Sequence, residues 1–287
     1  MIEFSIESTA GTIPLATRGG NTTPYVFEPG VTGLGLPPDL FEWQESPVAG
    51  GRVRSHRVGM RDAEWPIVIL GASQDEINTL ANELARIIDY EADPQLVARY
   101  TTGEVWRLGF YRVGGADNPV AGWGDSHLRW VLSVRCPDPY WVSDVPVTIG
   151  PIGAEPVPVG LLPDLAELHV GKSSTFGAVT VENPGDAPSP VSWRISGPGG
   201  PTSVLLGGVG FTFETPLIAG EIVTIERGPL GWTILDQLGA NRYADLGPAP
   251  KFPFVPKGST EAVIQMDDLA SGAAVTGFFK VKRKLVM

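Results

Sequence analysis

The hydrophobic positions of the chain repeat every two residues over most of its length, and in one segment they follow a helical period instead. That segment begins with Ser73 and Glu76, which have the spacing of a capping box at a helix N-terminus. Apolar residues then recur at the helical period, at Ile77, Leu80, Ala81, Leu84, Ile87 and Ile88. Asp93-Pro94 ends the pattern, because proline cannot continue a helix. The sequence therefore predicts one helix, over about residues 73–90.

Alternating runs on both sides of this helix predict strands in the first half of the chain. The longest run has one apolar face, made of Leu128, Trp130, Leu132, Val134 and Cys136. A shorter run places Trp106, Leu108 and Phe110 on one face. Because Cys136 lies on an apolar face, we interpret its free thiol as a small core group and not as a nucleophile.

The segment from Arg18 to Val58 has a different character, since it is rich in glycine and proline. Its period is too weak to predict a regular element, and its apolar residues are too many for simple disorder. We interpret it as an arm that covers a neighbouring subunit, although a loop packed on its own domain has the same composition. The candidate contact residues are Gly30, Gly33, Leu34, Leu36, Pro37 and Pro38.

Strand-like runs also fill the second half of the chain, bounded by breakers such as Asn183-Pro184-Gly185. They centre on Val179 with Val181, Val191 with Trp193 and Ile195, Phe211 with Phe213, Ile222 to Ile225, Trp232 with Ile234, Ala262 with Ile264 and Met266, and Phe279 with Val281. Short runs of this kind, with no helix among them, predict a β-sandwich.

A change in composition divides the chain, because prolines recur from Asp144 to Pro163 too often for a helix and favour an extended connector. We therefore expect a first domain over 1–143, a connector over 144–165 and a second domain over 166–287. The predicted fold class is mostly β: a β-sandwich with one α-helix, followed by a second β-sandwich.

Composition agrees with this fold class and limits the function. The chain has 287 residues with 36 glycines, 27 prolines and 43% hydrophobic residues, which suits short strands joined by tight turns. Its formal net charge of -11 argues against a protein whose main function is to bind nucleic-acid phosphates or anionic membranes. The single cysteine excludes an internal disulfide, and without a visible signal peptide or long apolar span we expect neither secretion nor membrane anchoring.

The residue patterns predict no catalytic, cofactor or metal site. The histidines, His56, His127 and His169, lack metal-ligand spacing. Gly33-Leu34-Gly35 lacks the strand-loop-helix context of a nucleotide site and is interpreted as a turn. The alternating lysines of Lys280 to Lys284 predict an edge strand protected against aggregation, and not a nucleic-acid site.

The first half of the chain contains Gly50-Gly51, Arg57-Val58-Gly59-Met60-Arg61, Trp65-Pro66-Ile67, the single helix, and Asp138-Pro139-Tyr140-Trp141, in this order. Together these stretches resemble the distal tail proteins of long-tailed, non-contractile phages, also described as minor tail or tail-component proteins. In the second half the stretches similar to the family's galectin-like sandwich are Val181 to Asp186, Arg194 to Pro198, Gly220-Glu221, Asn241-Arg242 and Phe254 to Gly258. Lys257-Gly258-Ser259-Thr260 departs from the family, which more often has Pro-Gly followed by Asn.

The resemblance implies a structural, non-enzymatic protein at the tail tip of a virion, made in the host cytoplasm. It implies a hexameric ring between the tail tube protein and the central hub protein, closed by the first domain, with the galectin-like domain projecting outward. Pro137 and Pro139 would then fix the direction in which the chain leaves the ring domain, with Tyr140 and Trp141 as rigid anchors. The alternative is an ordinary strand end with aromatic residues in the core. Both interpretations bury Trp141, so its burial alone does not distinguish them.

Two further expectations depend on this ring. DNA should pass through it without specific binding, and the acidic charge of the chain predicts a neutral or acidic lumen. The alternative function is a carbohydrate-binding β-sandwich module of a host-adhesion device. In that case Trp193 or Trp232 would be the platform for a sugar ring. We favour a core position for both, because Trp193 alternates with Val191 and Ile195 and large aromatic residues are mostly buried.

Overall fold

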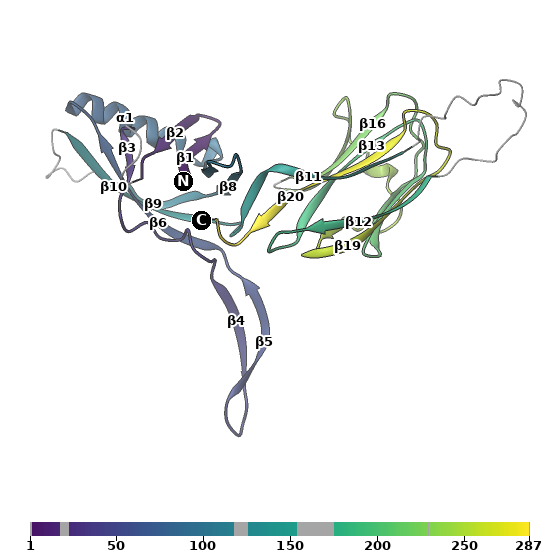
Figure 1. Ribbon diagram of the computed structural model, residues 1–287, viewed down its shortest axis with the longest axis horizontal. Helices are drawn as coiled ribbons and strands as arrows, with labels where there is room; N and C mark the ends of the chain where they lie inside the picture. The colour runs from purple at the N-terminus through teal and green to yellow at the C-terminus, as the bar shows by residue number, and fades with distance from the viewer. Residues whose placement is uncertain (1, 18–22, 118–125, 154–174, 229, 287) are drawn as a thin grey trace, which may run out of the picture. The chain divides into compact units, whose positions relative to one another are not determined.

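The computed structural model describes residues 2–17, 23–117, 126–153, 175–228 and 230–286. The chain divides into two compact units: Met1–Asp144 with Lys282–Met287, and Val145–Val281. Both units consist mainly of antiparallel strands, so the expected mostly β fold class is confirmed (Figure 1). The predicted connector over 144–165 lies partly outside the described residues, and its described part is extended strand. The hydrophobic pattern gave no sign that the end of the chain returns to the first unit.

Two sheets and a helix form the body of the first unit. One sheet has the order β11-β8-β7-β1-β2 and the other the order β3-β6-β10-β9. Trp65 lies at the centre of the core, fully buried, with its ring centroid 4.7 Å from that of Phe110. The strands are β1 (Ile2–Ser8), β2 (Gly11–Leu15), β3 (Tyr25–Phe27), β6 (Arg61–Leu70), β7 (Gln95–Tyr100), β8 (Val105–Gly109), β9 (Tyr111–Gly115), β10 (His127–Cys136) and the beginning of β11 (Trp141–Gly153).

The predicted helix is confirmed as α1 (Gln74–Ile87). The Ser73 side chain accepts a hydrogen bond from the Glu76 amide at 3.3 Å, and the Glu76 carboxylate accepts one from the Ala72 amide at 2.7 Å. These two bonds satisfy amides that have no partner within the helix. The buried face consists of Ile77, Ala81, Leu84 and Ile87. A short 3₁₀ turn, η1 (Tyr90–Ala92), follows the helix.

The alternating run in β10 is confirmed, since Leu128, Trp130, Leu132, Val134 and Cys136 are all buried. Cys136 pairs with Arg61 at the end of the β6–β10 ladder and has no exposed surface. Burial raises the pKa of its thiol to about 12. The thiol is therefore protonated at neutral pH, as the interpretation of Cys136 as a core group requires.

The expectation that Arg18–Val58 forms no regular element is wrong. Besides β3, this segment contains β4 (Asp39–Glu45) and β5 (Gly51–Val58), which pair as an antiparallel hairpin. Its register shifts between Glu42 and Trp43, so the two-residue period breaks there. With both faces of the hairpin exposed, no continuous apolar face marks the strands in the sequence.

The second unit is a β-sandwich of two sheets, as predicted. One sheet has the order β17-β16-β13-β20-β11, with β18 paired to β13, and the other has the order β12-β19-β14-β15. The strands beyond β11 are β12 (Thr175–Asn183), β13 (Ser189–Ser196), β14 (Thr202–Leu206), β15 (Val209–Phe213), β16 (Ile222–Gly228), β17 (Gly231–Asp236), β18 (Phe254–Val255), β19 (Gly258–Met266) and β20 (Ala274–Arg283), with a 3₁₀ turn η2 (Tyr243–Asp245). The sequence did not indicate β14 or β18.

The prediction of an edge strand at the C-terminal lysines is wrong. β20 carries Lys280 and Lys282 but lies between β13 and β11 in its sheet. Lys282 forms an ion pair with Asp138, its Nζ 2.6 Å from the carboxylate oxygen. This lysine therefore holds the end of the chain in place and does not protect a free edge.

We predict that Trp141→Ala lowers the free energy of unfolding by roughly 3 to 5 kcal/mol. Trp141 is fully buried at the start of β11, so truncation removes its packing and leaves a cavity. Urea unfolding followed by circular dichroism measures the change. Leu238→Ala is the control, because Leu238 is 87% exposed and its loss should cost less than about 1 kcal/mol. Equal effects of the two substitutions would contradict the burial argument.

We predict that Cys136 in the native protein resists iodoacetamide at pH 8, since the buried thiol with its raised pKa provides almost no thiolate. The same protein in concentrated urea should be alkylated within minutes, as an exposed cysteine is. Intact-mass spectrometry over time measures both rates. Rapid alkylation of the folded protein would show that the thiol is accessible and ionised.

Candidate functional site

One buried arginine, Arg61, connects the loop over 30–38 with the Asp138–Trp141 motif. Arg61 begins β6 and is 1% exposed. Its Nε and Nη2 both donate to the Pro139 carbonyl, at 3.2 and 2.7 Å. Nη1 donates to the carbonyls of Gly33, at 2.6 Å, and Gly35, and Nη2 also donates to that of Lys284, at 3.0 Å. All five N–H donors of the guanidinium are therefore used.

The partners of Arg61 come from three segments far apart in the sequence. Pro139 belongs to the Asp138–Trp141 motif, Gly33 and Gly35 to the loop over 30–38, and Lys284 to the end of the chain. Four backbone carbonyls thus obtain a partner from one side chain. Burial lowers the pKa of the guanidinium, but arginine stays charged in proteins. We call this set of contacts the Arg61 junction.

The loop over 30–38 is attached to its own unit at several points. The Thr32 amide donates to the Glu64 carbonyl at 2.9 Å, and the Gly59 amide donates to that of Pro38 at 2.8 Å. Gly33 has a φ of 73°, and a Cβ there would lie 2.3 Å from the Ala63 Cβ, so only glycine fits. Leu36, in contrast, is 71% exposed. Contact of this loop with a neighbouring subunit stays a prediction.

The end of the chain is held beside the Asp138–Trp141 motif by charged side chains. Lys282 pairs with Asp138 and its ammonium lies 5.9 Å from the centroid of the Tyr140 ring. The Arg283 guanidinium lies 4.5 Å from the centroid of the Trp106 ring. These contacts and the bond from Arg61 to the Lys284 carbonyl fix the last residues on the first unit.

The β4–β5 hairpin presents two unlike faces. On one face the Phe41 ring lies 5.7 Å from that of Trp43 and 4.7 Å from that of His56, measured between centroids. On the other face Glu42 accepts a hydrogen bond from Ser55 at 2.9 Å. Phe41, Trp43 and Val53, like Leu40, are exposed large apolar residues. Figure 1 shows the ribbon leaving the body of the first unit.

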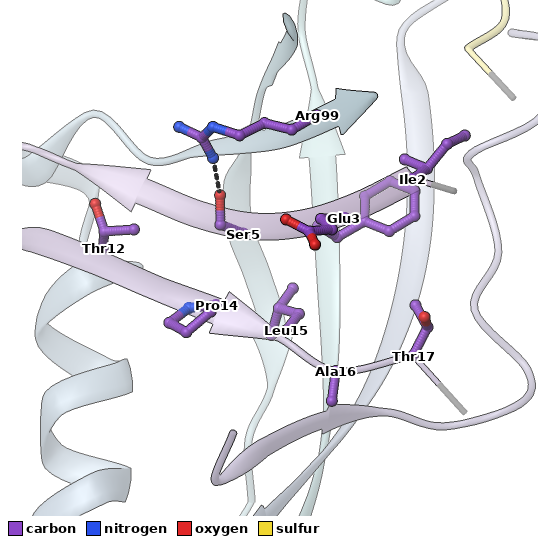
Figure 2. A pocket seen from close by; sticks show the side chains of 10 residues that line it. Ile2, Glu3, Ser5, Thr12, Pro14, Leu15, Ala16, Thr17 and Arg99 are labelled. Atoms are coloured by element: carbon purple, nitrogen blue, oxygen red, sulfur yellow. Dashed lines mark hydrogen bonds between the residues drawn. The ribbon is translucent and has the colours of Figure 1, made fainter. Parts of the chain in front are cut away.

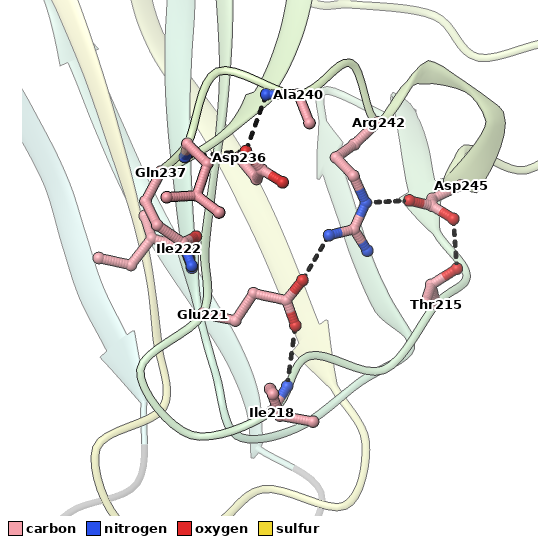
Figure 3. A network of polar contacts seen from close by, with 10 residues as sticks. Thr215, Ile218, Glu221, Ile222, Asp236, Gln237, Ala240, Arg242 and Asp245 are labelled. Atoms are coloured by element: carbon pink, nitrogen blue, oxygen red, sulfur yellow. Dashed lines mark hydrogen bonds and ion pairs between the residues drawn. The ribbon is translucent and has the colours of Figure 1, made fainter.

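The second unit has a polar network where two loops meet (Figure 3). Arg242 donates to the carboxylates of Glu221 and Asp245, and Asp245 also accepts from the Thr215 hydroxyl at 2.7 Å. The bond from Arg242 lowers the pKa of the Asp245 carboxyl. Because each charged group has a partner inside the network, we interpret it as a brace between loops.

The tryptophans proposed as sugar platforms differ in their burial. Trp193 is 1% exposed, so the expected core position beside Val191 and Ile195 is confirmed and Trp193 cannot stack on a sugar ring. Trp232 is half-buried, and its ring stacks on that of Phe252 with centroids 4.7 Å apart. Carbohydrate binding at Trp232 stays a prediction.

The two histidines in the described part of the chain lie on different strands. His56 lies in the hairpin, 2.9 Å from Asp39, and His127 begins β10, whereas His169 lies outside the described residues. Within the described ranges, no group of three or more histidine, cysteine, aspartate or glutamate side chains could hold a metal ion. No helix in the described part of the chain is long and apolar enough to cross a membrane.

The chain matches no protein-family model and no curated protein. Among solved structures it is similar to the Dit protein of phage SPP1, described as a paradigm of the hub adsorption apparatus in phages that infect Gram-positive bacteria. That match has a TM-score of 0.53 and 11% identity, over 97% of this chain and 98% of the other. The phage P2 baseplate in its activated conformation gives TM-scores of 0.58 with calcium and 0.57 with strontium, at 11% and 10% identity over all of both chains. At such identities the likeness shows a shared fold along the whole chain.

The role of Arg61 was not predicted from the sequence. Its position contains a usable signal, because Arg61 occupies the same face of β6 as the buried Ala63, Trp65 and Ile67. An arginine in phase with core residues must find partners for its donors, so it predicts a buried polar junction. Which carbonyls it meets depends on the tertiary fold.

We predict that Arg61→Met lowers the free energy of unfolding by about 3 to 5 kcal/mol, because it leaves buried carbonyls without a donor. Arg61→Lys should recover only part of this loss, since lysine has three donors in place of a planar fork of five. The control is Arg129→Met, which removes a half-exposed ion pair with Glu28 and should cost less than about 1 kcal/mol. Urea unfolding measures all three variants. An unchanged midpoint for Arg61→Met would contradict the role of the junction.

Proposed function

We propose that the chain is a structural subunit of a phage tail tip, where it forms a closed ring, with six copies expected, between the tail tube and the hub. The observation that carries the proposal is the fold shared with the phage hub and baseplate chains over the full length of both units. The proposed role is architectural: no enzymatic activity and no cofactor is assigned to the chain.

The exposed hairpin supports assembly with further chains. A two-stranded ribbon is at best marginally stable in water unless it packs against something. Here the ribbon exposes Phe41, Trp43 and Val53 to solvent, and its base is fixed by the Arg61 junction and by the bond between Gly59 and Pro38. We propose that a neighbouring copy covers it in the ring, as the arm predicted over Arg18–Val58 would require.

The charge of the chain supports passage of DNA through such a ring. At a formal charge of -11 per copy, a closed ring carries a large negative total. We propose a neutral or acidic lumen, because clustered lysine and arginine would bind phosphates and slow the passage of DNA. The remaining proposed partners are the tail tube and hub proteins.

We predict that replacing Leu40–Arg57 with a two-residue Asn-Gly turn abolishes ring formation but leaves the body of each unit folded. The Cα atoms of Asp39 and Val58 are register partners, so a short turn can join them, and the described core residues lie outside the ribbon. Native mass spectrometry measures the assembly, and circular dichroism measures the fold. This change is cleaner than deleting Gly30–Pro38, which would also disturb the Arg61 junction.

A variant that still forms rings would exclude the hairpin as a necessary subunit contact. A wild-type chain that stays monomeric or forms only a two-fold dimer, at high concentration and with tube and hub partners present, would contradict the proposed function itself.

A further inference from the structure

We propose that residues 282–286 form a latch that couples the base of the β4–β5 hairpin to the second unit. The latch lies where β20, a strand of the second unit's sheet, ends among residues that fix the hairpin. While it is closed, the hairpin base and the end of β20 hold one another in place. Every contact of the latch lies within one chain, so the latch does not depend on the proposed ring.

The chain passes between the two units through two strands. β11 crosses after Asp144, and β20 crosses back before Lys282. The two strands are neighbours in one sheet. The second unit is therefore attached to the first by two strands while both crossings are held, and by one strand when either crossing is released.

A row of charged side chains holds the first crossing. Asp144 accepts a hydrogen bond from Arg107 at 2.8 Å, and Arg107 also pairs with Glu7 at 2.8 Å. Glu7 pairs with Arg99 as well, and Arg99 donates to the Ser5 hydroxyl at 2.8 Å (Figure 2). These partners of Asp144 lie on β8, β1 and β7, outside the hairpin and outside the latch. The first crossing therefore stays held when the second is released.

Contacts of two kinds hold the second crossing. Val286 is buried, at 4% exposure, and the Lys284 carbonyl accepts a hydrogen bond from the buried Arg61 at 3.0 Å. The ion pair between Lys282 and Asp138 is open to solvent on the side of the carboxylate, so it contributes little by itself. Closure of the latch thus depends mainly on the burial of Val286 and on the bond from Arg61.

The same residues reach the hairpin base by two routes. The Nζ of Lys284 lies 3.9 Å from the carboxylate of Asp39, the first residue of β4, and Asp39 lies 2.9 Å from His56 on β5. Arg61 binds the loop before β4, and the end of that loop accepts a hydrogen bond from the Gly59 amide at 2.8 Å. The side chain and the carbonyl of Lys284 are therefore both linked to the hairpin base.

A latch of this kind passes the state of the hairpin to the second unit. Opening it requires local unfolding of a few residues, which costs less than unfolding of the whole unit. Because coupling between two sites is reciprocal, whatever stabilises the hairpin base closes the latch by the same factor, and opening the latch loosens the base. The state of the hairpin thereby determines whether one strand or two attach the second unit.

The first test is hydrogen–deuterium exchange of the full-length chain, measured in fragments that contain Gly59 and in fragments from the end of β20. Val286→Asp opens the latch, because it places a charge in a buried site. We expect exchange to become about 30-fold faster at the end of β20 and about tenfold faster at Gly59. The matched control is Leu285→Asp, since Leu285 is 37% exposed and a charge there leaves the latch closed.

A charge-reversal cycle tests the coupling itself. Lys284→Glu and Asp39→Lys each place like charges together across the contact of 3.9 Å. We expect Lys284→Glu to speed exchange at Gly59, and Asp39→Lys to speed exchange at the end of β20, by about fivefold each. The double variant restores opposite charges and should exchange within about twofold of the wild type at both places. The control is Glu45→Lys, at the other end of β4, which should change neither.

The outcomes separate the latch from the proposed function. Restored protection in the double variant supports the coupling. Faster exchange at the end of β20 without a change at Gly59, or a double variant as open as the single ones, overturns it. If α1 also loses protection in Val286→Asp, that variant has unfolded the unit and the charge-reversal cycle decides. Native mass spectrometry of the same samples reports assembly: coupling in a wild type that stays monomeric contradicts only the ring, and absence of coupling in a wild type that assembles contradicts only the latch.

Discussion

The first unit depends on the burial of one guanidinium. Arg61 gives up its hydration and is compensated by four backbone carbonyls in place of a carboxylate. Carbonyl oxygens cannot move independently of the main chain, so the arginine fixes the paths of three segments at once. A single core position thereby determines where the loop over 30–38 runs, how the chain leaves β10, and where its last residues lie.

The Arg61 junction also fixes the base of the β4–β5 hairpin. The hairpin follows directly after the loop that Arg61 holds, and Gly33 fits against Ala63 so closely that a side chain there would collide. The base of the ribbon is therefore fixed although its strands are exposed. In the proposed ring, a ribbon fixed in this way would lose less conformational freedom on binding a neighbouring copy, and the contact would be tighter for that reason.

Elements with one apolar face could be predicted from the sequence, and elements without one could not. The capping box at Ser73 and the alternation of β10 were sufficient because each buries one face against the core. The β4–β5 ribbon buries neither face, and its register shifts at Trp43. Its sequence therefore shows no two-residue alternation of apolar and polar residues. The candidate residues of the loop and of the Asp138–Trp141 motif were recognised separately. Their meeting at Arg61 depends on long-range pairing between β6 and β10 that local patterns do not contain.

The measurement that tests the account most directly is an electron cryo-microscopy reconstruction of the purified full-length chain with tube and hub partners. We expect a closed ring in which each β4–β5 hairpin lies over the next copy. A stable monomer, a two-fold dimer, or a ring whose hairpins remain free of neighbouring copies would contradict it.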